Sequence, residues 1–166
     1  GRPYAASDPH LLAWVHLAET WAFHAAHQVY GPTALSRRDS DAYVASMASI
    51  AERLGVLDPP RSLAALESQL TAYRPELEGT RDARDTASFL LDDPPLAGTE
   101  RLAYDRLAAA AVAVVPEWTR ELLGRRRGTA RRRVDIAVGR RVVAGFRWAS
   151  EHPAHEPQWE RTRMRA

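Results

Sequence analysis

The sequence contains no cysteine and no lysine, and these absences exclude several kinds of chemistry within its 166 residues. Without cysteine, the chain cannot form a disulfide, a thiolate metal site or a cysteine nucleophile. All 23 basic residues are arginine, which excludes a Schiff-base lysine and the lysine of a phosphate-binding P-loop. The longest strongly apolar run, residues 107–115, is far shorter than the roughly 20 residues of a membrane-spanning helix, so we expect no membrane span.

The length and composition indicate a globular protein of one domain. A chain of 166 residues that is 45% hydrophobic and 27% charged can bury a sizeable core. The net charge of +2 does not by itself indicate a nucleic-acid partner. The N-terminus lacks the basic and apolar regions of a signal peptide, and we therefore expect a cytoplasmic location. Because the sequence does not begin with methionine, we also expect residues upstream of Gly1.

Apolar residues recur at helical spacing along the chain, and no segment alternates as a strand would. Caps and breakers such as Asp8 or Ser7, Ser36, Gly55, Thr80 and Gly124 mark the helix ends. The expected helices cover residues 9–30, 37–54, 63–74, 81–91, 99–115, 117–123 and 129–148. The sequence thus predicts an all-α fold, with one helical domain of about six or seven helices over residues 1–150 and a polar tail over residues 151–166.

His16 is the sharpest candidate for a functional residue. The first expected helix carries an apolar face formed by Leu12, Val15, Ala22, Phe23 and Ala26. His16 lies on this face, which we expect to point into the interior. A neutral imidazole in an apolar interior needs either a hydrogen-bond partner, such as a carbonyl, a hydroxyl or Glu19, or a metal.

Other residues on the same helix leave two interpretations open. His24 and His27 could chelate a metal at their three-residue spacing, or they could form a solvated polar edge. Trp14 and Trp21 are seven residues apart and fall on roughly the same side of the helix. They could pack in the core or form one wall of an apolar ligand pocket.

Two arginine runs, residues 125–127 and 131–133, could bind phosphate or nucleic acid. No aromatic residue interleaves with them, and Asp135 is the only acidic residue nearby in the sequence. We therefore expect a solvated basic loop and helix start, and no nucleic-acid partner.

The segment Tyr4–His16, YAASDPHLLAWVH, resembles the Y-x-A-x-D-P-x-x-L-x-W-V-H segment of the oxygenase mpaB/rubber oxygenase (latex clearing protein) family. The similarity continues in five further segments, so that it covers about residues 3–150. These segments span residues 19–23, 30–32, 54–62, 72–77 and 116–124.

The resemblance implies a globin-like core that holds haem b, with His16 as the proximal ligand of the iron. It places Leu12, Val15, Glu19 and Phe23 nearest the porphyrin or in the hydrogen-bond shell of the ligand. Characterised relatives cleave carbon–carbon double bonds of isoprenoid chains with dioxygen. The implied function is therefore a haem-dependent oxygenase acting on an apolar substrate that the sequence does not name.

In the family, the distal residues near the iron precede this segment, so we expect them upstream of Gly1. The 166 residues by themselves lack a complete set of catalytic groups. This leaves a second hypothesis open, in which the chain is a non-enzymatic helical module that binds a ligand or a partner. A basic nucleic-acid binder that uses the arginine runs ranks last.

Overall fold

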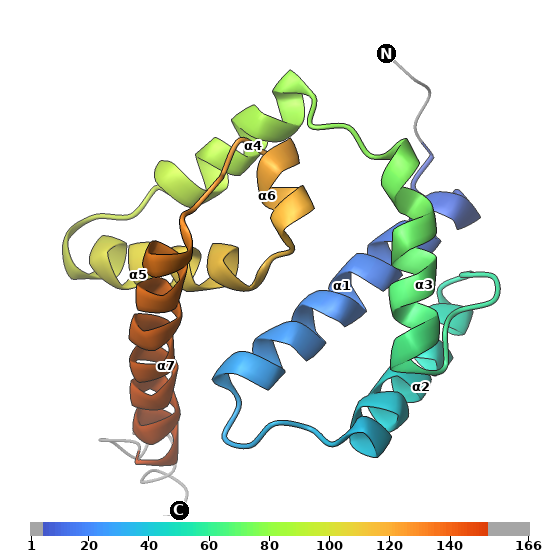
Figure 1. Cartoon of the computed structure of the whole chain (residues 1–166), viewed down its shortest axis with the longest axis horizontal. Helices are drawn as coiled ribbons and strands as arrows, with labels where there is room; N and C mark the ends of the chain where they lie inside the picture. Colours follow the sequence, from blue (N-terminus) through green and yellow to red (C-terminus); the bar gives the residue numbers. More distant parts are fainter. Residues whose placement is uncertain (1–4, 153–166) are drawn as a thin grey trace, which may run out of the picture.

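A computed structural model describes residues 5–152, and every regular element in this range is a helix (Figure 1). The elements are α1 (Pro9–Tyr30), α2 (Arg37–Arg53), α3 (Leu63–Tyr73), the 3₁₀ turn η1 (Arg74–Glu76), α4 (Arg81–Asp92), α5 (Gly98–Val114), α6 (Glu117–Leu122) and α7 (Thr129–Glu151). The predicted all-α class is confirmed. The last helix continues to Glu151, and the predicted tail lies outside the described residues from residue 153 onward.

The predicted capping residues set the helix ends. Asp8 accepts a hydrogen bond from the backbone N–H of His10, and Ser36 accepts one from that of Asp39. Each bond satisfies a donor that the first turn of a helix leaves free. Gly55 follows α2 with a φ of +92°, a left-handed conformation that glycine adopts without steric cost.

α1 is the central element of the fold. It contacts α2 and α3 on one side and α5 and α7 on the other, as Figure 1 shows. Leu17 of α1 packs with Val44 and Leu66 in a small buried core between α1, α2 and α3. Within residues 5–152, no helix combines the length and the apolar character that crossing a membrane requires.

α5 and α7 pack closely because small residues line their contact. A Cβ atom built on Gly139 would lie only 2.5 Å from the Cβ of Ala110. The hydroxyl of Tyr30, at the end of α1, donates to the carbonyl of Ala110 at 2.8 Å. This bond ties the end of α1 to the α5–α7 pair.

The expectation that the apolar face of α1 points into the interior is wrong at three positions. Val15 is 49% exposed and Phe23 is 58% exposed, and Ala22 is exposed as well. The buried side of α1 carries Leu17, Thr20 and His24 instead, because α2 and α3 pack there. Apolar spacing predicts a stripe on a helix, but it does not predict which side the neighbouring helices cover.

Candidate functional site

His16 is buried in α1, and its two ring nitrogens differ in their surroundings. Nδ1 lies 3.4 Å from the hydroxyl oxygen of Thr20, one helical turn further on. Nε2 is also buried, yet among residues 5–152 it has no hydrogen-bond partner. A buried polar atom without a partner costs free energy and is rare in folded proteins. This nitrogen is therefore a candidate for binding a ligand.

Burial lowers the pKa of His16 below its ordinary value of 6.5, and the negative charge of Glu19 opposes this shift. The imidazole is therefore held in its neutral form near neutral pH. Neutral imidazole is the form that coordinates metals. The electrostatics of the site thus favour the protonation state that a metal ligand needs.

The other residues predicted for the site lie around His16 on the more open side of α1. Leu12 is half-buried, whereas Val15, Glu19 and Phe23 are exposed. Thr20, rather than Glu19, contacts the Nδ1 atom of His16. The sequence reasoning missed Thr20, although a hydroxyl four residues after a histidine on a helix is a signal that could have found it.

A cavity of about 470 Å³ lies on another side of α1. Trp14 and Trp21 both line it, together with residues of α3 and α6. Both tryptophans therefore form part of a pocket wall, and Trp21 also packs against the buried core, so the two interpretations both hold for Trp21. With 100° of rotation per residue, both side chains project from the side of α1 opposite His16.

His24 is buried, so the interpretation as a solvated edge is wrong for this residue. Its Nε2 lies 2.9 Å from the hydroxyl of Ser40 and 3.1 Å from the amide nitrogen of Gln28. Because the Gln28 amide nitrogen can only donate, Nε2 accepts, as in the neutral ring. The described residues contain no group of three histidine, aspartate or glutamate side chains that could hold a metal ion.

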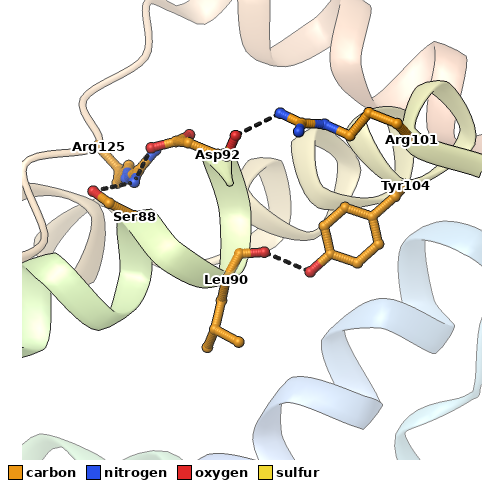
Figure 2. Close-up of polar contacts among 6 residues, drawn as sticks. All are labelled: Ser88, Leu90, Asp92, Arg101, Tyr104 and Arg125. Atoms are coloured by element: carbon orange, nitrogen blue, oxygen red, sulfur yellow. Dashed lines mark hydrogen bonds and ion pairs between the residues drawn. The ribbon is translucent and has the colours of Figure 1, made fainter. Parts of the chain in front are cut away.

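The arginine runs pair with carboxylates of the same chain. Arg125 makes two hydrogen bonds of 2.6 Å to Asp92 at the end of α4, as Figure 2 shows. Arg127 and Arg131 both pair with Asp135, which is buried. In the sequence Asp135 is the acidic residue near these arginines. In the folded chain Asp92 also lies beside them. Much of the positive charge that could attract a nucleic acid is neutralised internally.

Comparison with known families identifies the family to which the chain belongs. The family model described as ER-bound oxygenase mpaB/B'/Rubber oxygenase, catalytic domain, matches residues 1–148. The chain belongs to this family. Neither the curated proteins nor the solved structures contain a match to the chain.

Membership of the mpaB/rubber oxygenase family supports an oxygenase activity. The match includes the segment Tyr4–His16 and every residue predicted for the site. An oxygenase of this kind acts on a substrate together with oxygen.

Proposed function

We propose that this chain is a haem b-dependent oxygenase that acts with dioxygen on an apolar substrate, and that His16 is the protein ligand of the iron. Family membership supports the oxygenase activity. The single observation that carries the haem assignment is the buried Nε2 of His16, which lacks a hydrogen-bond partner among residues 5–152.

The donor set suits haem better than a bare metal ion. A haem iron takes its equatorial ligands from the porphyrin, so one axial histidine from the protein is sufficient. His16 is neutral because of its burial, and one of its nitrogens is available. Since Nε2 is buried, the side chains that cover it must move apart when a group binds there, while Nδ1 can stay beside Thr20.

The open side of α1 also suits a large flat apolar group. Val15 and Phe23 are exposed apolar side chains on the same side of the helix, and Leu12 is half-buried beside them. Exposed apolar side chains that gather on one face indicate a binding surface. Glu19 lies on the same side and leaves a negative charge near the imidazole.

When bound, haem supplies the iron that activates dioxygen. The contribution of this chain is to hold and shield that group. A proton on Nδ1 of His16 can be donated to the hydroxyl of Thr20, which leaves the lone pair on Nε2. The apolar side chains of Leu12, Val15 and Phe23 would exclude water from the proximal side, where it would compete for the metal.

A hemin titration tests the proposal. We expect the chain to develop a sharp Soret band with a saturable one-to-one end point, and we expect His16→Ala to lose it. His27→Ala is the matched control, since it removes another histidine from the same helix, and it should keep the band. A wild-type chain that gains no Soret band, or a band that survives in His16→Ala, would overturn the proposal.

The second hypothesis, a non-enzymatic binding module, makes a different prediction. Such a module would bind an apolar ligand stoichiometrically without consuming oxygen. Measuring oxygen uptake with an isoprenoid substrate by hemin-loaded protein that includes the residues expected upstream of Gly1 separates the two. We expect uptake that depends on both hemin and substrate.

A further inference from the structure

The cavity of about 470 Å³ beside α1 is separate from the surface around His16. Its walls come from α1, α3 and α6 and from the segment after η1. Trp14, Trp21, Leu70, Leu77, Trp118 and Leu122 form most of its apolar lining. Small-molecule sites in proteins have volumes of roughly 300–1,000 Å³ and are lined mostly by apolar and aromatic side chains.

Helix geometry separates this cavity from the proposed iron site. Trp14 precedes His16 by two residues and Trp21 follows it by five, which places both about 140–160° around α1 from the histidine at 100° per residue. A molecule in the cavity would therefore be shielded from the His16 surface by the backbone of α1. Trp14 and Trp21 therefore face away from a group ligated by His16.

The charges around the cavity disfavour an anionic ligand. Arg74 lines it, but its guanidinium lies over the ring of Trp118, 5.1 Å from the ring centroid. Glu67 and Glu78 also line the cavity, so the carboxylates outnumber the guanidinium there. A ligand with a phosphate or carboxylate would meet repulsion, whereas an uncharged apolar molecule would bury the indole surfaces without leaving a charge unpaired.

Two contacts within the protein hold the wall formed by α6 in place. A Cβ atom on Gly79 would lie only 1.9 Å from the carbonyl oxygen of Leu122, so the loop before α4 rests directly on this part of the wall. Arg84 of α4 also donates to the same carbonyl at 3.1 Å. Pockets that are already formed lose less conformational entropy when a ligand binds.

We propose that this cavity is a binding site for an uncharged, apolar small molecule, distinct from the oxygenase site. Three tryptophans, Trp14, Trp21 and Trp118, supply both the binding surface and a fluorescence signal for measuring binding. The proposal does not depend on haem, because it rests on the cavity and its lining alone.

The experiment uses N-phenyl-1-naphthylamine, an uncharged apolar fluorophore, and measures energy transfer from tryptophan to the probe in the 166-residue chain. We expect saturable binding to the wild type. Ala22→Trp should weaken it about tenfold or more, because Ala22 lines the cavity at an exposed position where a larger side chain reduces the space. Since Ala22 is exposed, this variant should fold; its circular dichroism spectrum checks that it does.

Two controls make the result specific. Ala111→Trp places the same side chain at an exposed alanine of α5 outside the cavity and should leave probe affinity unchanged. Phe23→Ser changes the open side of α1 near His16 and should also leave it unchanged. Equal probe affinity in the wild type and Ala22→Trp, or loss of binding in Phe23→Ser, would overturn the proposal. Tighter binding of the anionic probe 1-anilinonaphthalene-8-sulfonate than of N-phenyl-1-naphthylamine would also overturn it. None of these outcomes depends on the hemin result.

Discussion

The Nδ1 atom of His16 lies 3.4 Å from the hydroxyl oxygen of Thr20, and both side chains are buried in α1. This contact leaves the other ring nitrogen, Nε2, as the one without a partner among residues 5–152. We therefore infer that Thr20 positions the imidazole in the proposed haem site.

Replacing Thr20 with valine tests this role. Thr20→Val keeps the shape of the side chain but removes the hydroxyl, and we expect hemin affinity to fall about tenfold or more, as for other residues that orient metal-bound histidines. Thr20→Ser keeps the hydroxyl and should retain most of the affinity. Equal affinities for the two variants in a hemin titration would contradict the assigned role.

Gly139 and Gly145, two glycines of α7, provide a test of how closely α5 packs against α7 and its control. Gly139→Ala would place a Cβ atom 2.5 Å from that of Ala110, so we expect a loss of about 1–3 kcal/mol in the free energy of unfolding. At Gly145, no atom of another part of residues 5–152 lies within 4 Å of the corresponding position. Gly145→Ala should therefore stabilise the protein by about 0.5–1 kcal/mol through its higher helix propensity. Urea denaturation measures the free energy of unfolding of both variants. A Gly139→Ala variant more stable than the wild type would show that α5 and α7 are not in close contact.

His24 should make the stability depend on pH. Burial lowers its pKa below the ordinary 6.5; the charge of Glu67 opposes this shift and that of His27 adds to it. Below pH 6.5 the unfolded chain binds the proton more readily than the folded protein, so this contribution to stability is present above pH 6.5 and is lost as the pH falls toward the lowered pKa.

His24→Gln should reduce the loss of stability on acidification without abolishing it, because burial also lowers the pKa of His16. Urea midpoints measured at several pH values from about 7 to about 5 would test this expectation. If the urea midpoint falls equally steeply with decreasing pH in the wild type and in His24→Gln, His24 makes no contribution to the pH dependence.

The ion pair between Arg125 and Asp92 should stabilise the end of α4 (Figure 2). The side chain of Arg125 is mostly buried, but that of Asp92 is 55% exposed, so solvent screening limits the contribution. We expect Arg125→Gln to cost about 1 kcal/mol and to speed amide exchange in the last turn of α4. Arg126→Gln breaks a pair with Glu121 in which the arginine is 79% exposed, and it should cost less than about 0.5 kcal/mol. Equal costs for the two variants would argue against a specific role of Arg125.

The helix boundaries could be predicted from the sequence because they depend on local chemistry. Asp8, Ser36 and Thr80 bond to backbone donors within three residues of themselves, and the conformation of Gly55 ends α2. Such contacts need no knowledge of the remaining fold.

The burial of individual side chains could not be predicted in the same way. Leu90, a large apolar residue of α4, is 52% exposed because α4 packs only lightly, mainly against α5. A solvated edge was one of the two interpretations of His24, but Ser40 of α2 lies against it and bonds to it. Both outcomes depend on which helices meet, and this information is not contained in the periodicity of one helix.

Resonance Raman spectroscopy of the hemin-loaded, reduced chain is the most direct test of the central claim. A band from the iron–histidine stretch should appear, and it should shift to lower frequency when the protein is labelled with ¹⁵N-histidine. It should be absent in His16→Ala and present in His27→Ala. A chain that gives no such band, or a band that persists unchanged in His16→Ala, would contradict the assignment of His16 as the iron ligand.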